Sequence, residues 1–195
     1  MNQKQRLLIL DLDNTIRQTI SGNEFINDDP EDQELIKGTA QKIKEYKDAG
    51  YRIVGITNQK GVSLGYKTLD NCIKEQRFTL GLCPELERIL FCPDDGDSLV
   101  IISREATFMI NSKTFLNSNM IDEYKSLDSS IIKGFDSFRK PGIGAIQFLS
   151  LDRDICRDRS LFVGDMETDL QCAEKAKIKF LYPQEWLDKK VGDFV

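Results

Sequence analysis

Short apolar runs that alternate with helical patterns constrain the fold of this chain more than any other feature. The runs have the length and continuous apolar character of strands that are covered on both faces, and they lie at residues 6–10, 51–57, 89–92, 160–164 and 179–182. Helical patterns separate them at residues 38–50, 67–79, 141–152 and 169–178. This alternation predicts an α/β fold in which a parallel sheet carries helices on both faces.

Length and composition fit one ordinary globular unit. The chain has 195 residues, of which 40% are hydrophobic and 30% charged, and it contains no repetitive tract. We therefore expect a single domain over residues 1–195. The formal net charge is −5 with both signs interleaved, which argues against a blanket basic surface for nucleic acid, although a local patch would escape such a count.

The amino-terminal apolar run is too short for a signal peptide, and no stretch of about 18 apolar residues is present. We expect a cytoplasmic protein with no membrane partner.

The chain has no histidine, which removes several kinds of chemistry at once. Ser-His and Cys-His nucleophile pairs and histidine-ligated zinc are all excluded. The five cysteines are widely spaced and form no CxxC pair, so they read as small buried hydrophobes or incidental thiols. Any reaction must therefore use carboxylates, lysine, hydroxyls or a metal held by carboxylates.

Polar side chains follow three of the expected strands at the point where each strand ends. Asp11 and Asp13 follow the first strand, Thr57 and Asn58 follow the second, and Asp165 follows the strand at 160–164. The carboxyl ends of parallel strands meet at one edge of the sheet, which is where ligands bind in such folds. The sequence therefore predicts an active site at this edge.

Four short motifs occur in a characteristic order along the chain: DLDNT at 11–15, ITN at 56–58, Lys140 in RKPG, and GDMETD at 164–169. Together they resemble the haloacid dehalogenase-type phosphohydrolase superfamily, and the resemblance spans residues 6 to about 182. It implies a Rossmann-like sheet with a minimal cap domain or none.

The phrases TNQ at 57–59 and RKP at 139–141 narrow the resemblance. They are similar to the branch that holds histidinol-phosphate phosphatase, heptose-bisphosphate phosphatase and polynucleotide kinase 3′-phosphatase domains. The chain lacks the GxxxxGK[ST] loop of a kinase partner domain, so we do not predict 5′-phosphorylation.

The resemblance implies roles for the carboxylates. Asp11 would attack phosphorus to form an aspartyl-phosphate, and Asp13 would act as general acid and then general base. Mg²⁺ would screen the repulsion between carboxylate and phosphoryl group, held by Asp11, the backbone carbonyl of Asp13 and Asp165. Asp169 would support the site from behind or bind the ion through water.

Lys140 would neutralise the phosphoryl oxygens, and Thr57 with Asn58 would donate hydrogen bonds to them. Each motif also has a plainer interpretation when taken alone. A DxD pair is common in turns, and a Thr-Asn pair is common at helix caps. A lone lysine is normally solvated. An acid in the first turn of a helix, as Asp169 would be, interacts favourably with the helix dipole. The ordered set of motifs favours the catalytic interpretation.

The chain departs from the family pattern in two places. Asn14 stands where many relatives have glycine, and we infer no loss of activity from it. The segment FCPDDGDSLVIIS at 91–103 lies where metabolite phosphatases of this branch often carry a zinc loop, and it keeps only Cys92, so no structural zinc is expected. Residues 17–37 and 94–138 are the expected specificity segments, too short for a large cap and consistent with an open site.

Three functions stay open at this point. The first is a Mg²⁺-dependent phosphatase of a small phosphorylated metabolite, and the second is the same chemistry on a nucleic-acid 3′ end. The third is a non-catalytic binding module that retains the fold. Four basic residues could contact a phosphorylated ligand but read more simply as solvated surface: Arg17, Arg104, Lys133 and Arg139.

Overall fold

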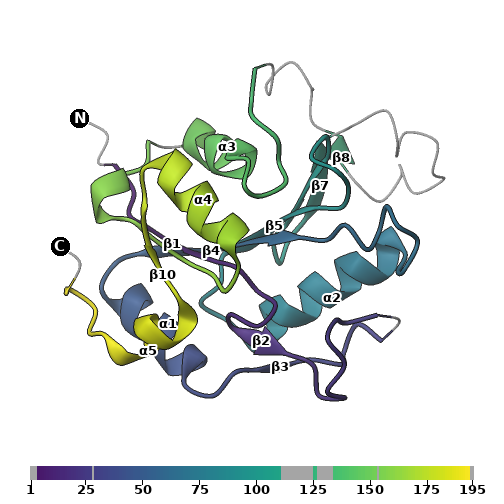
Figure 1. The fold of residues 1–195 in the computed structure, drawn as a ribbon, viewed down its shortest axis with the longest axis horizontal. Coiled ribbons are helices and arrows are strands. Elements are labelled where there is room, and N and C mark those ends of the chain that lie inside the picture. Colours follow the sequence, from purple (N-terminus) through teal and green to yellow (C-terminus); the bar gives the residue numbers. More distant parts are fainter. Residues whose placement is uncertain (1–3, 28, 111–124, 127–133, 153, 194–195) are drawn as a thin grey trace.

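The computed structural model describes residues 4–27, 29–110, 125–126, 134–152 and 154–193. Its centre is an eight-stranded sheet with the strand order β10-β9-β1-β4-β5-β6-β7-β8 (Figure 1). The strands are β1 Leu7–Leu10, β4 Arg52–Asn58, β5 Arg88–Cys92, β6 Leu99–Ile102, β7 Thr107–Ile110, β8 Lys125–Ser126, β9 Leu161–Val163 and β10 Lys179–Leu181. Strands β10, β9, β1, β4 and β5 pair in parallel, as the alternation of strands and helices predicts.

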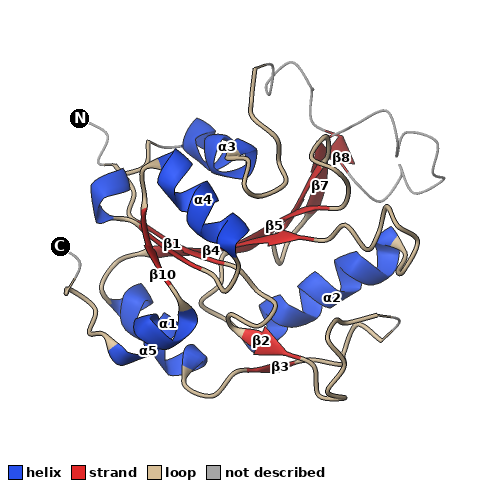
Figure 2. Ribbon diagram, in the orientation of Figure 1, coloured by secondary structure: helices blue, strands red, loops and turns tan. Residues whose placement is uncertain are grey.

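Helices cover both faces of the sheet, which confirms the predicted α/β class (Figure 2). One face packs against α1 Thr39–Asp48, α2 Leu69–Leu82 and α5 Pro183–Asp188, and the other against α3 Gly144–Asp152 and α4 Glu167–Ala176. In β1 the side chains alternate between the two layers, and all four residues of the strand are fully buried. This double burial explains why the strand reads as a continuous apolar run rather than an alternating one.

The segment at 94–138, whose structure the sequence pattern does not predict, extends the sheet. Strand β6 runs antiparallel to both β5 and β7, and β7 pairs in parallel with β8. The sheet is therefore mostly parallel, with one reversed strand. Within this segment, residues 111–124 and 127–133, and with them Lys133, lie outside the described residues.

Between β1 and α1 the described residues form a small antiparallel pair, β2 Arg17–Gln18 and β3 Glu34–Leu35. A short 3-10 helix, η2 Arg157–Arg159, precedes β9. Helix α5 was not expected, although Pro183 at its first turn is a normal start signal. No helix within the described ranges is both long and apolar enough to cross a membrane.

Candidate active site

The first motif leaves β1 in a tight turn at the carboxyl edge of the sheet. The backbone N–H of Asp11 donates to the carbonyl of Val163 at 2.9 Å, so β1 and β9 end together. Asn14 adopts a left-handed backbone with φ of 56°, a conformation that asparagine tolerates better than most residues. The left-handed turn after Asp13 is therefore compatible with asparagine at this position.

Three carboxylates gather at this edge. Ligand oxygens of Asp11, Asp165 and Asp169 all lie within 4.8 Å of one another. The ammonium of Lys140 lies 2.5 Å from both Asp11 Oδ1 and Asp169 Oδ1. The hydroxyl of Thr15 lies 3.5 Å from Asp11 Oδ2 and 3.5 Å from Asp165 Oδ1. Residues as far apart in the sequence as Asp11 and Asp169 thus meet in one cluster, which contains three acids and one lysine.

Burial perturbs the titration of this cluster. It raises the pKa of Asp11 to about 7, although the adjacent Lys140 opposes the rise. Burial, together with the nearby Asp169, also raises the pKa of Asp165. The pKa of Lys140 is raised because its two carboxylate partners outweigh the opposite effect of burial. The cluster therefore carries an excess of negative charge that is costly without a further cation.

The donor set suits a hard divalent cation. Carboxylate oxygens are the side-chain ligands that Mg²⁺ takes in proteins, usually from one or two residues together with phosphate and water. Asp11, Asp165 and Asp169 supply such oxygens at the required proximity, and the excess charge favours a cation among them. The residues present therefore fit the expected metal.

Lys140 is held at both ends. Its backbone N–H donates to Asn58 Oδ1 at 2.9 Å, and the Asn58 amide donates back to the Lys140 carbonyl at 3.0 Å. Its ammonium donates to the carbonyl of Ile56 at 3.0 Å. The Asn58 side chain, which we expected to donate to phosphate, is used here to hold the Lys140 backbone.

Thr57 is buried at the end of β4, and its hydroxyl accepts a hydrogen bond from the Gln59 amide at 3.2 Å. The same Gln59 amide donates to Asp13 Oδ2 at 2.9 Å. Gln59 therefore connects the second motif to the first. It is the last residue of the TNQ phrase at 57–59, which is the sequence signal that marks this position.

The carboxylate of Asp13 lies beside the cluster but in a different electrostatic environment. The Arg17 Nε–H donates to Asp13 Oδ1 at 2.9 Å. The Asp13 side chain is 29% exposed. Burial alone would raise the pKa of Asp13, but Arg17 and the hydrogen bonds around it hold that pKa below its ordinary value. Asp13 is thus kept ionised, whereas the pKa of Asp11 is pushed upward.

Asp169 is fully buried at the start of α4. Its Oδ2 accepts from the backbone N–H of Met166 at 3.0 Å, which caps the helix, while its Oδ1 lies against Lys140. A Cβ at Gly164 would lie 2.5 Å from this carboxylate, so the close approach requires glycine. Asp169 therefore both caps helix α4 and belongs to the acidic cluster.

The interpretation of Arg17 as solvated surface is wrong. Its side chain is fully buried and pairs with the partly exposed carboxylate of Asp13 and the buried carboxylate of Glu75. Arg104 is exposed, as expected, and its guanidinium donates to the backbone carbonyls of Leu80, Cys83 and Leu86 in and just after α2. Periodicity could not reveal either environment, because both depend on contacts between distant segments.

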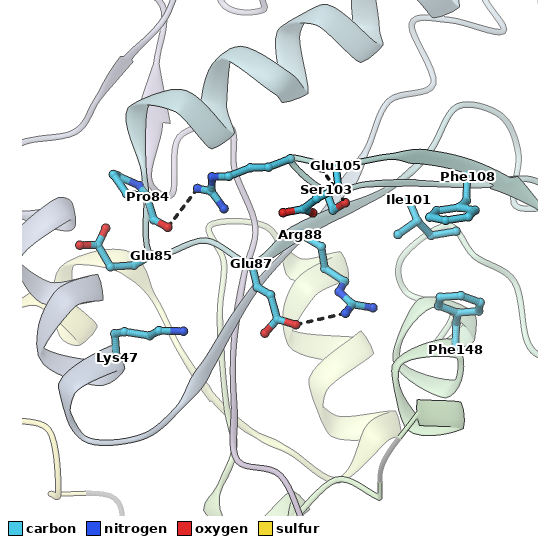
Figure 3. Close-up of a pocket in the computed structure, with 11 residues that line it drawn as sticks. Lys47, Pro84, Glu85, Glu87, Arg88, Ile101, Ser103, Glu105, Phe108 and Phe148 are labelled. Atoms are coloured by element: carbon cyan, nitrogen blue, oxygen red, sulfur yellow. Dashed lines mark hydrogen bonds and ion pairs between the residues drawn. The ribbon is translucent and has the colours of Figure 1, made fainter. Parts of the chain in front are cut away.

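A cavity of about 540 Å³ lies at the opposite edge of the sheet, where β5 begins (Figure 3). Its lining includes Phe108, Phe148 and the hydrogen-bonded pair Glu87 and Arg88. The acidic cluster and Asn58 lie at the other end of the parallel strands, where Asn58 pairs with Cys92. The cavity is therefore separate from the acidic cluster.

Comparisons with known proteins give the chain a family and a fold. Residues 6–187 match the family described as polynucleotide kinase 3 phosphatase. A D-glycero-D-manno-heptose-1,7-bisphosphate 7-phosphatase of Thermosynechococcus vestitus is 26% identical over 75% of this chain and 64% of the relative. The chain thus spans a little under two thirds of that relative's length.

Two crystal structures share the fold. A candidate HAD-like phosphatase of Mesorhizobium loti aligns with a TM-score of 0.60 at 20% identity, covering 91% of this chain and 71% of the other. A D,D-heptose 1,7-bisphosphate phosphatase of B. bronchiseptica, complexed with magnesium and phosphate, aligns with a TM-score of 0.58 at 18% identity. That alignment covers 98% of this chain and 90% of the other. The predicted Rossmann-like fold and the predicted superfamily are confirmed.

Proposed function

The chain belongs to the polynucleotide kinase 3 phosphatase family, and we propose that it is a Mg²⁺-dependent phosphomonoesterase that acts through an aspartyl-phosphate. The observation that carries the proposal is the cluster of Asp11, Asp165 and Asp169 within 4.8 Å, with Lys140 at 2.5 Å from two of them. A carboxylate nucleophile, a cation site and a fixed positive charge are the parts that phosphoryl transfer requires.

In the first step, a carboxylate oxygen of Asp11 forms a bond to phosphorus while the bond from phosphorus to the leaving oxygen breaks. Asp13 gives its proton to that oxygen, which departs as an alcohol. Asp13 is ionised in the free protein, and the negative charge of an incoming phosphoryl group favours its protonation. The ammonium of Lys140 lies beside the nucleophile and offsets charge on the phosphoryl oxygens.

In the second step, Asp13 takes a proton from water as the water oxygen attacks phosphorus. The bond between phosphorus and Asp11 breaks, so that inorganic phosphate leaves and Asp11 is restored. When bound, Mg²⁺ supplies charge neutralisation between the Asp11 carboxylate and the phosphoryl group. Asp11, Asp165, Asp169 and the backbone carbonyl of Asp13 would hold it.

We propose a small phosphorylated metabolite of the sugar-phosphate class as the substrate. The heptose-bisphosphate phosphatase among the relatives supports this class. A nucleic-acid 3′-phosphate is the second proposal, favoured by the match of residues 6–187 to a family named for that activity. The two differ in the leaving group and share the same chemistry at phosphorus.

The test is release of inorganic phosphate from sugar phosphates, histidinol phosphate, nucleotides and a 3′-phosphorylated oligonucleotide, with Mg²⁺ or with chelator. We expect turnover that needs both Mg²⁺ and Asp11, and Asp11→Asn should lower it by about three orders of magnitude or more. Oligonucleotide activity that falls steeply with salt would select the second substrate class. Activity that survives Asp11→Asn would refute the aspartyl-phosphate, and inactivity on every substrate would favour a binding role.

A further inference from the structure

A buried chain of alternating charges lies behind Asp13 and connects it to helix α2. The Arg17 guanidinium lies 2.9 Å from Asp13 Oδ1 through Nε and 2.5 Å from Glu75 Oε1 through Nη2. Glu75 Oε2 in turn lies 2.5 Å from the ammonium of Lys67. Arg17 is 0% exposed, Glu75 1% and Lys67 8%. Two bases and two acids therefore balance one another, and of the four only Asp13, at 29% exposure, reaches solvent appreciably.

The third guanidinium nitrogen of Arg17, Nη1, is also hydrogen-bonded. Its Nη1 donates to Gln33 Oε1 at 3.2 Å, to Gln76 Oε1 at 3.2 Å and to Thr79 Oγ1 at 2.5 Å. A guanidinium is planar and rigid, so contacts on every edge fix the direction of each N–H bond. Helix α2 and Gln33 thus determine where the Arg17 Nε–H points, and it points at Asp13.

Stability alone does not account for this arrangement. A buried ion pair usually contributes no more than apolar side chains of the same volume, because desolvation offsets the attraction. The network also ends at Asp13, the group that transfers the proton in the proposed reaction. Arg17 holds Oδ1 of Asp13 and Gln59 holds Oδ2, so both carboxylate oxygens have a fixed donor.

We propose that Arg17 is a positioning residue that orients the Asp13 carboxyl toward the leaving oxygen, and that Glu75 fixes Arg17 from behind. The proposal rests on the proposed function, in which Asp13 transfers the proton. Arg17 would not touch substrate and would act through Asp13 alone. Its loss should therefore impair proton transfer while phosphoryl binding and attack by Asp11 persist.

Leaving groups of different basicity separate this role from a general loss of structure. An alkyl leaving group needs the proton from Asp13, whereas the nitrophenolate of p-nitrophenyl phosphate departs without one. For Arg17→Lys we expect kcat/KM to fall by about 100-fold on the best alkyl phosphate and by less than about threefold on p-nitrophenyl phosphate. Slower hydrolysis of the aspartyl-phosphate should also produce a burst of p-nitrophenol.

A double-variant cycle gives a second readout. If Arg17 acts only through Asp13, Arg17→Lys should cause no further loss of alkyl-phosphate turnover in the Asp13→Asn background. A residue that merely supports the fold would lower turnover by the same factor in both backgrounds.

Arg52→Lys is the matched control. Arg52 also forms a bidentate salt bridge with a glutamate, Glu87, through two guanidinium nitrogens. It lies at the start of β4, away from the site. We expect Arg52→Lys to leave the kcat/KM ratio of the two substrates unchanged. Glu75→Gln is the second variant, for use if Arg17→Lys does not fold, and it should reproduce the substrate-selective loss in weaker form because Glu75 does not contact Asp13.

Equal losses on both substrates, or an additive loss in the Asp13→Asn background, would overturn the positioning role while leaving the phosphatase assignment intact. A wild-type protein that releases no phosphate, or does so without Asp11, would instead refute the proposed function. The two failures are therefore distinguishable in one set of assays.

Discussion

Two largely buried charge clusters, each with one partly exposed acid, meet at the carboxyl edge of the sheet, and they are balanced differently. The first cluster sets three carboxylates, those of Asp11, Asp165 and Asp169, against Lys140. The second alternates Asp13, Arg17, Glu75 and Lys67 with equal numbers of each sign. The clusters share neither a lysine nor an acid, although Asp11 and Asp13 are two residues apart.

The difference indicates what each cluster is for. An excess of buried carboxylate is relieved by protonation or by a further cation, so the first cluster is suited to binding a metal. A balanced cluster needs no additional charge and resists rearrangement, so the second is suited to holding a side chain in one direction. The following predictions test this contrast, in order of decreasing effect.

The two lysines provide the sharpest test, because both are nearly buried, at 3% and 8% exposure. Lys140→Met should lower phosphate release by about 10³-fold, since it removes positive charge beside the nucleophile, whereas Lys67→Met should cost less than about tenfold. Steady-state phosphate release under Mg²⁺ measures both. Comparable losses would remove the distinction between the clusters.

Glu75→Gln should lower the free energy of unfolding by about 3 kcal/mol, because it leaves two buried cations with one acid. Urea unfolding followed by circular dichroism measures the change. Asp70→Asn is the control on the same helix, where the pair with Lys74 is exposed, and it should change the free energy by less than about 0.5 kcal/mol. A Glu75 variant as stable as the control would show that the second cluster is not under electrostatic constraint.

Magnesium should stabilise the first cluster specifically. At about 100 times its dissociation constant, Mg²⁺ should raise the melting temperature by about 5–10 °C, and chelator should reverse the rise. Differential scanning fluorimetry measures this without reference to activity. Asp165→Asn should lose most of the rise, and Glu75→Gln should keep it. A shift of equal size in both variants would place the ion elsewhere.

The smallest effect is expected in the metal-free protein. Asp165→Asn should raise its melting temperature by about 2 °C, because burial and the nearby Asp169 disfavour the Asp165 charge. Asp136→Asn should shift it the other way, since the hydrogen bond from Lys175 holds the pKa of Asp136 below its usual range. Shifts of the same sign would contradict the excess of negative charge in the first cluster.

The sequence by itself determined the α/β class and the edge of the sheet at which the candidate site lies. Continuous apolar runs mark strands covered on both faces, and the residue after each run must emerge where the strand ends. The positions of Asp11 and Asp165 were predictable for that reason, and the absence of histidine limited the chemistry to carboxylates, lysine, hydroxyls or a metal held by carboxylates.

Only the tertiary structure decided how the charges are partnered. Arg17 reads as a surface residue along the chain, yet it is buried against Glu75, 58 positions away. Asn58 meets the backbone of Lys140 across 82 positions, and strand β6 runs against its neighbours. Local periodicity reports which face of an element is apolar, whereas a buried ion pair or a strand direction depends on segments that meet only after the chain has folded.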